Sequence, residues 1–116
     1  MKTLLSKEEL EYQWTIPDFV LKTQKQIAKD FALYGYDFEE HFINSELPLV
    51  EIENAISEQL ALLMKEGETK LLQLLYQIDI PQSQFIELLN RDTFVMELSG
   101  LIVRREAYKV YLRSKF

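Results

Sequence analysis

The sequence predicts an all-α fold, and three observations support this prediction. The 116 residues include only three glycines and three prolines, so little in the chain favours the frequent turns of a β fold. Apolar residues recur at three- and four-residue steps over long stretches, which is the period of an amphipathic helix. No segment alternates apolar and polar side chains as a half-buried strand does. We therefore expect an antiparallel up-down bundle of three long helices, with two short helices packed across it.

The expected bundle uses the whole chain, residues 1–116, as a single domain. A chain of this length can bury a core without disulfides or metals. Residues 1–14 are predicted to form an N-terminal arm that packs on the bundle. The long helices are expected at about residues 17–43, 48–78 and 93–115, and the short ones at about 7–13 and 82–90.

Capping and proline signals define most of the expected helix ends. Ser6 and Glu9 have the Ser-x-x-Glu spacing of a capping box, in which each side chain accepts from the other residue's backbone amide. Pro17 suits a first helical turn because its φ is already helical. Pro48 and Pro81 disfavour helix at the residue before them, so we expect them to separate the later helices.

Two glycines leave the internal boundaries open. The apolar stripe passes through Gly35 without losing its register, which favours one helix to about residue 43, although a glycine can also end a helix. Gly67 either separates two shorter helices or lies within one long helix. The unbroken stripe and the favourable spacing of Glu66 and Lys70 favour the long helix.

The last predicted helix is unusual because apolar residues fall on two of its sides. Met96, Val103 and Val110 lie on the smaller side. Arg105 lies near the middle of the larger side. A helix of this kind must be covered on both sides. The larger side carries Phe94, Leu98, Leu101, Ile102, Tyr108, Leu112 and Phe116.

Arg105 and Asp79 are expected to form an ion pair. An arginine keeps its proton, and an unpaired buried charge costs several kcal/mol, so a buried Arg105 needs a partner. Asp79 is the only acid in its segment and would be unfavourable at a helix C-terminus without one. The pair would determine how the last helix docks. The alternatives are that Arg105 extends to solvent and that Asp79 only organises the turn before Pro81.

Composition and motifs argue against the common catalytic sites. The chain has no cysteine, which excludes thiol catalysis and thiolate metal sites. Its only histidine, His41, shares a helix face with Asp37, but Glu-x-x-His, the motif of di-iron bundles, is absent. Phosphate-binding glycine loops are also absent. We therefore expect no catalytic residues, no metal and no cofactor.

Charge and hydropathy suggest where the protein acts. The net charge of −6 argues against binding to nucleic acid. The basic tail, residues 104–116, either complements the dipole of the last helix or forms a patch for an anionic partner. No apolar run is long enough to span a bilayer, and the amino terminus lacks a signal-peptide core. We therefore expect no membrane association and a cytoplasmic location.

These observations predict a non-enzymatic interaction or scaffold protein that forms a homodimer or binds another protein. The expected interface comprises Met96, Val103 and Val110 on the second side of the last helix, together with Tyr36, which is predicted to be exposed. The alternative is a small-ligand-binding bundle or an enzyme with an anion pocket at Arg105.

Overall fold

Seven helices make up the part of the chain that the computed structural model describes, residues 3–115, and that range contains no strand. The all-α prediction is confirmed. None of these helices is long and apolar enough to cross a membrane. The helices are α1 (Lys7–Gln13), α2 (Pro17–Ala32), α3 (Glu40–Asn44), α4 (Leu49–Glu66), α5 (Glu68–Ile78), α6 (Gln82–Ile86) and α7 (Phe94–Lys115).

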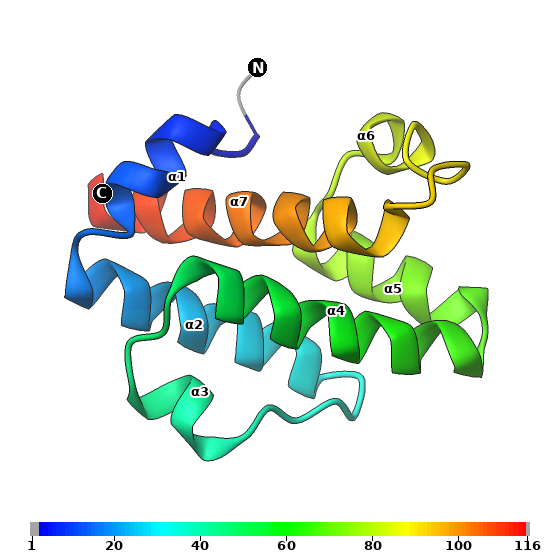
Figure 1. Cartoon of the computed structure of the whole chain (residues 1–116), viewed down its shortest axis with the longest axis horizontal. Coiled ribbons are helices and arrows are strands. Elements are labelled where there is room, and N and C mark those ends of the chain that lie inside the picture. The colour runs from blue at the N-terminus through cyan, green and yellow to red at the C-terminus, as the bar shows by residue number, and fades with distance from the viewer. Residues whose placement is uncertain (1–2, 116) are drawn as a thin grey trace.

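The last helix, α7, lies at the centre of the arrangement. It packs mainly on α4 and α2, and it also contacts α1 and α5. α1 and α6 lie on one side of α7, and α3 lies on the opposite side of the molecule, below α2 and α4 in Figure 1. The arm that begins the chain therefore packs on the helix that ends it.

The direction of the helices corrects the expected up-down topology. α2 and α4 run in the same direction in Figure 1, whereas α5 and α7 run in the opposite direction. The long helices α2 and α4 can be parallel because the segment between them, which contains α3, carries the chain back along the bundle. The expected continuous helix over residues 17–43 would have left no segment to make this return.

Gly35 ends α2 and explains why the expected helix 17–43 is wrong. Its φ is +81°, a left-handed conformation that glycine adopts without steric cost. The amide of Gly35 donates to the carbonyl of Ala32 (3.1 Å), and that of Tyr36 to Phe31 (3.3 Å). These two bonds form the glycine-based Schellman cap.

Gly67 likewise divides the expected helix 48–78 into α4 and α5. Its φ and ψ are +122° and 161°, a combination that is open only to glycine at low cost. The apolar stripe keeps its register across this break because α4 and α5 both face the same core. The stripe alone therefore could not distinguish one helix from two.

The ends of the short helices follow local signals. Ser6 and Glu9 form both bonds of the predicted capping box at α1, with donor–acceptor distances of 3.1 and 2.9 Å. α6 ends at Ile86, earlier than the predicted residue 90, and the chain then continues in turns to Phe94. The segment around α3 is held by Gln24, whose fully buried amide nitrogen donates to two carbonyls, Phe42 (2.6 Å) and Ser45 (2.7 Å).

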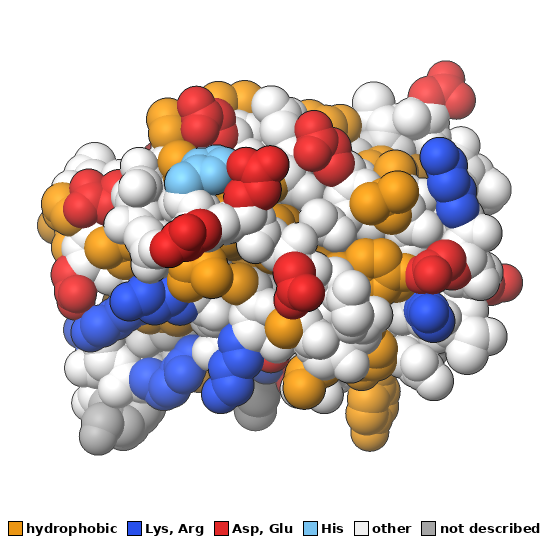
Figure 2. Space-filling model, turned by 90° about the horizontal axis from the view of Figure 1, so that it is seen from below, with side chains coloured by type: hydrophobic (Ala, Val, Ile, Leu, Met, Phe, Trp, Pro, Cys, Tyr) orange, Lys and Arg blue, Asp and Glu red, His pale blue; other side chains and the backbone are white. Residues whose placement is uncertain are grey.

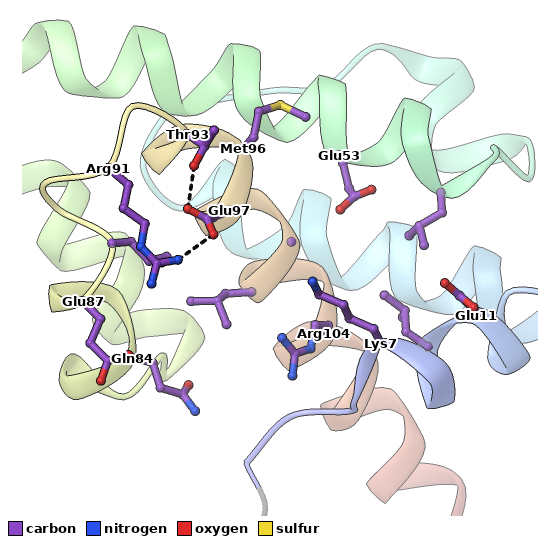
Figure 3. A pocket seen from close by; sticks show the side chains of 15 residues that line it. Lys7, Glu11, Glu53, Gln84, Glu87, Arg91, Thr93, Met96, Glu97 and Arg104 are labelled. Carbon is purple, nitrogen blue, oxygen red and sulfur yellow. Dashed lines mark hydrogen bonds and ion pairs between the residues drawn. The ribbon is translucent and has the colours of Figure 1, made fainter.

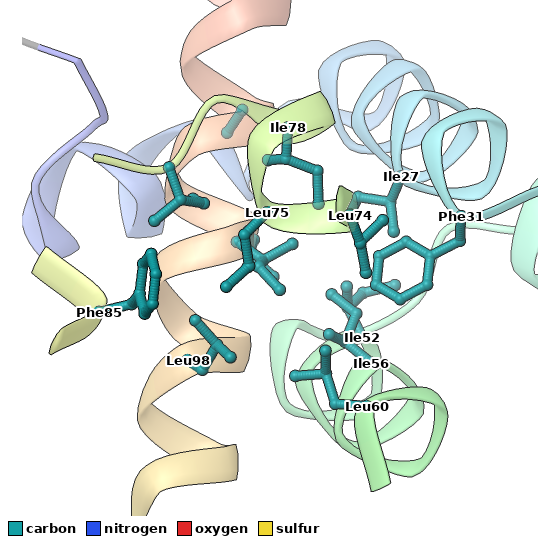
Figure 4. Packing of buried hydrophobic residues seen from close by; sticks show 14 of the residues in the cluster. Ile27, Phe31, Ile52, Ile56, Leu60, Leu74, Leu75, Ile78, Phe85 and Leu98 are labelled. Atoms are coloured by element: carbon teal, nitrogen blue, oxygen red, sulfur yellow. The ribbon is translucent and has the colours of Figure 1, made fainter. Parts of the chain in front are cut away.

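The core lies where α2, α4, α5 and α7 meet. Figure 4 shows buried side chains of α2, α4, α5 and α7 meeting in this cluster. A fully buried aliphatic or aromatic side chain contributes roughly 1.5–3 kcal/mol, so this cluster is the main source of stability. Its fully buried members include Ile27, Phe31, Ile52, Ile56, Leu60, Leu74, Ile78 and Leu98.

We predict that Gly67→Ala lowers the free energy of unfolding by about 1–3 kcal/mol, because alanine is strained at this φ. Urea unfolding followed by circular dichroism measures the change. Gly100→Ala is the control: Gly100 lies inside α7, where an added Cβ meets only Glu53 Oε2 at 3.4 Å. This control gains helix propensity. Stabilisation by Gly67→Ala would instead indicate one continuous helix.

Candidate functional site

Arg105 joins three parts of the chain. Its Nη2 lies 2.9 Å from Asp79 Oδ2, its Nε donates to the carbonyl of Ile78 (3.2 Å) and its Nη1 to that of Thr3 (2.6 Å). The structure thus brings the two residues of the expected ion pair together. The pair is only half buried, because the Arg105 side chain is 13% exposed and the Asp79 side chain 79% exposed.

Asp79 has a second role that the sequence did not reveal. Its φ and ψ are +70° and +50°, the left-handed conformation that closes a helix. The amide of Asp79 donates to Tyr76 (3.1 Å) and the amide of Ile80 to Leu75 (3.0 Å), which is the Schellman pattern usually built on glycine. Asp79 therefore ends α5 and also binds Arg105, a contact that glycine could not make.

The alternative of an anion pocket at Arg105 is not supported by its surroundings. Each of the three nitrogens of its guanidinium has a protein acceptor, which uses three of its five N–H groups. Arg105 also lies outside the lining of the three grooves described below. These contacts favour a role of Arg105 in docking α7.

The charged residue at the centre of the α7 interface is Glu106, which the sequence analysis missed. Its side chain is fully buried, beside the nearly buried Asp30 of α2. Lys109 Nζ lies 2.8 Å from Glu106 Oε1 and 3.2 Å from Asp30 Oδ2. The contact with Glu106 is an ion pair without hydrogen-bond alignment. Burial, reinforced by Asp30, raises the pKa of the Glu106 carboxyl well above its ordinary value.

A signal for Glu106 was present in the sequence. It lies four residues after Ile102 and four before Val110, both of which are buried, so all three share a helix face. The apolar pattern instead divides these neighbours, with Ile102 on the larger side of α7 and Val110 on the smaller side. The buried face takes residues from both sides, whereas Leu101 and Tyr108 of the larger side are only partly buried.

The expected interface residues are placed differently from the prediction. Val103 and Val110 are buried by the chain's own helices, and Tyr36 packs against the core with a buried hydroxyl. Val103 and Val110 are therefore corrected to internal residues, and Tyr36 is corrected from exposed to partly buried. Met96 is 49% exposed. It lines the largest of the grooves.

The largest of the three grooves lies between α1 and α6, with α7 and the start of α4 as its floor, and we call it the α1–α6 groove. Its volume is about 730 Å³. The nitrogens of Lys7 and Arg104 face the middle of this groove, with Glu11 on the α1 side and Glu87 on the α6 side (Figure 3). The apolar part of its lining comprises Leu10, Leu49, Leu88, Met96 and Leu101.

Two smaller grooves have opposite charges, and together we call them the charged face. Figure 2 looks at the molecule from below and shows a cluster of basic side chains at lower left, with acidic side chains mainly above it and hydrophobic side chains among them; further basic side chains lie at the right. The acidic groove, of about 310 Å³, includes Asp37, Glu39, Glu51, Glu58 and His41. The basic groove, of about 420 Å³, includes Lys22, Lys25, Lys29 and Arg113.

The charges of the basic groove come from two distant segments. Three are the lysines of α2, and the fourth is Arg113 of the basic tail, which contacts Gln26 of α2. Lys22 pairs with Asp18 (3.0 Å). Among the described residues, Lys25 and Lys29 have no ion-pair partner. The tail thus lies beside a basic helix, which the sequence pattern did not indicate.

His41 and Asp37 both line the acidic groove. His41 Nδ1 lies 3.1 Å from Glu39 Oε2, and both side chains are exposed. Within residues 3–115, no three acidic, histidine or cysteine side chains are grouped to hold a metal ion. No family model, curated protein or solved structure matches this chain. Its functional surfaces are therefore identified from geometry and charge.

We predict that Arg105→Ala lowers the free energy of unfolding by about 2 kcal/mol, because hydrogen bonds to charged groups contribute roughly 1.5–3 kcal/mol. Asp79→Asn should cost less than about 1 kcal/mol, since Asp79 is exposed and Asn tolerates a left-handed φ. A double-mutant cycle by urea unfolding should give a coupling above about 0.5 kcal/mol. Additive effects below that value would mean that no coupled pair forms.

We predict a pH dependence from Glu106. The pKa of Glu106 is raised in the folded state. Its contribution to the free energy of unfolding is therefore full below the unfolded pKa of 4.5 and is lost as the pH rises toward the folded pKa. Glu106→Gln has no ionisable group at this position, so it avoids this loss of stability. Its stability relative to wild type should therefore rise by more than about 1 kcal/mol between pH 5 and pH 8. Urea unfolding at both pH values measures this, with the exposed Glu58→Gln as control. An unchanged difference would contradict the prediction.

Proposed function

We propose that this protein is a non-enzymatic interaction protein that forms a two-fold dimer through the charged face. The observation that carries the proposal is the separation of opposite charges on one face (Figure 2). Residues of one sign on neighbouring elements repel each other, and no ion pair within residues 3–115 relieves that repulsion for Lys25 and Lys29. A surface of opposite charge would relieve it.

The acidic groove of a second copy is a suitable surface. In a two-fold dimer, residue i contacts residue j of the partner and residue j contacts residue i. An axis in the plane of the charged face, between its two grooves, therefore places each acidic groove against the partner's basic groove. The complementary contact is made twice, and the hydrophobic side chains between the grooves meet near the axis.

The charged face is large enough for this contact. The Cα atoms of the molecule extend over 35 Å and 25 Å along the two axes of the view in Figure 2. A specific interface needs about 800 Å² from each partner, which such a face can supply. Charge complementarity at an interface chiefly determines the partner and the rate of association.

This basis for self-association differs from the one that the sequence suggested. The sequence suggested self-association through exposed apolar residues on the second side of the last helix, but Val103 and Val110 are buried within the chain. A dimer through the charged face does not require exposed apolar residues on α7. The proposal keeps a cytoplasmic location, which the absence of cysteine is consistent with.

Exchange of charges between the two halves tests the dimer. Lys25→Glu/Lys29→Glu should remove the net positive charge of the basic groove, and Glu51→Lys/Glu58→Lys should remove the net negative charge of the acidic groove. We predict that wild type is dimeric at 100 µM in about 20 mM salt and dissociates as salt rises, since screening shortens the range of these contacts. Each variant alone should be monomeric, and an equimolar mixture should form a heterodimer. Size-exclusion chromatography with light scattering measures all three.

A charge-matched control separates the charged face from net charge. Glu8→Lys/Glu87→Lys changes the net charge as Glu51→Lys/Glu58→Lys does, but on α1 and after α6, on the far side of the molecule. It should remain dimeric. A monomeric wild type in 20 mM salt, or a mixture of the two variants that stays monomeric, would overturn the proposal.

A further inference from the structure

A second surface, the α1–α6 groove, lies on the opposite side of the molecule from the charged face. α1 and α6 form its walls above α7 in Figure 1, whereas Figure 2 shows the molecule from below. An apolar floor and a charged rim are the usual composition of a site that receives a peptide segment. The charges of the rim indicate which segment fits.

The cations at the middle of the groove have no acid at ion-pair distance. Among the described residues, no carboxylate lies within ion-pair distance of Lys7 or Arg104. Burial raises the pKa of the Glu53 carboxyl in the same groove, and the charge of Lys7 opposes this at longer range. Arg104 Nε donates to the carbonyl of Leu5 (2.7 Å), so its position is fixed by the N-terminal arm. Arg104 is partly buried, and burial lowers the pKa of its guanidinium. A partly buried cation gains more from an acidic ligand than a fully hydrated one.

The acids of the groove lie around these cations. Arg91 and Glu97 neutralise each other at 2.7 Å, so they add no net charge. Glu11 lies toward α1 and Glu87 toward α6 (Figure 3), and neither has an ion-pair partner among the described residues. Glu53, which also lines the groove, offsets one of the two central cations. The net charges along the groove are therefore acidic, basic and acidic. This order disfavours a simple anion such as a fatty acid, whose ends would meet acids.

We propose that the α1–α6 groove binds a peptide segment of another protein, in which apolar residues accompany one acidic side chain placed between two basic ones. The acidic side chain pairs with Arg104 and Lys7, and the basic side chains pair with Glu11 and Glu87. The apolar residues contact the floor between Leu88 and Leu101. Together with a dimer through the charged face, this site would make the protein a bivalent adaptor, although peptide binding does not depend on the dimer.

Selection of phage-displayed random 16-residue peptides on the wild-type protein tests this site. Enriched peptides should contain apolar residues and an acidic residue flanked by basic ones. Fluorescence anisotropy of the synthesised peptides should show at least tenfold weaker binding to Lys7→Glu/Arg104→Glu, because reversing two central charges replaces attraction by repulsion. Peptides with the central acid changed to lysine should regain affinity for that variant.

Two further variants separate the groove from folding and from the dimer. Lys7→Glu alone leaves the Arg104–Leu5 bond in place and should still weaken binding several-fold, even if the double variant folds poorly. Glu51→Lys/Glu58→Lys, on the charged face, should bind the peptides normally. Failure to enrich any peptide, or enriched peptides that bind Lys7→Glu as tightly as wild type, would overturn the proposal. Enrichment of peptides that match a segment of this chain would overturn it in favour of self-binding.

Discussion

Burial of α7 between α2 and α4 is the constraint on which the other contacts depend. The buried side of α7 contains Glu106 among its apolar residues, and a buried carboxyl needs polar neighbours. Asp30 and Lys109 supply these neighbours. Lys109 can pair with both acids only at one register of α7 against α2, because Asp30 belongs to α2 whereas Glu106 and Lys109 belong to α7. The polar cluster therefore specifies a docking geometry that apolar packing alone would leave less well defined.

The opposite edge of α7 holds the ends of other elements in place. Arg104 and Arg105 are consecutive, yet one binds the carbonyl of Leu5 and the other binds Thr3 and the end of α5. Asp79 combines a helix-ending conformation with an ion pair to Arg105. The N-terminal arm and the α5 turn are thereby attached to the same stretch of α7. This attachment builds one wall of the α1–α6 groove and so connects the fold to the proposed peptide site.

The two proposed binding surfaces, the charged face and the α1–α6 groove, lie on opposite sides of the molecule. The charged face is formed by α2, α3, α4 and the basic tail, and the groove by α1, α6 and the first half of α7. Because the surfaces share few residues, an occupant of one leaves the other open. The chain's acidic character is thus unevenly distributed. The basic groove is positively charged although the chain as a whole has a net charge of −6.

The sequence by itself determined the helical class, the capping box of Ser6 and Glu9, the helix start at Pro17 and the extent of the last helix, because these follow from contacts between residues a few positions apart. It also suggested the pairing of Arg105 with Asp79, since each residue needed a partner. Only the tertiary structure decided that the buried face of α7 lies between its two apolar sides. This face combines Leu98 and Ile102 of the larger side with Val103 and Val110 of the smaller side, and Glu106 lies between the two groups beside Asp30 of α2. The parallel direction of α2 and α4, and the meeting of the basic tail with the α2 lysines, are likewise tertiary results, because they arise from segments that are far apart in the chain.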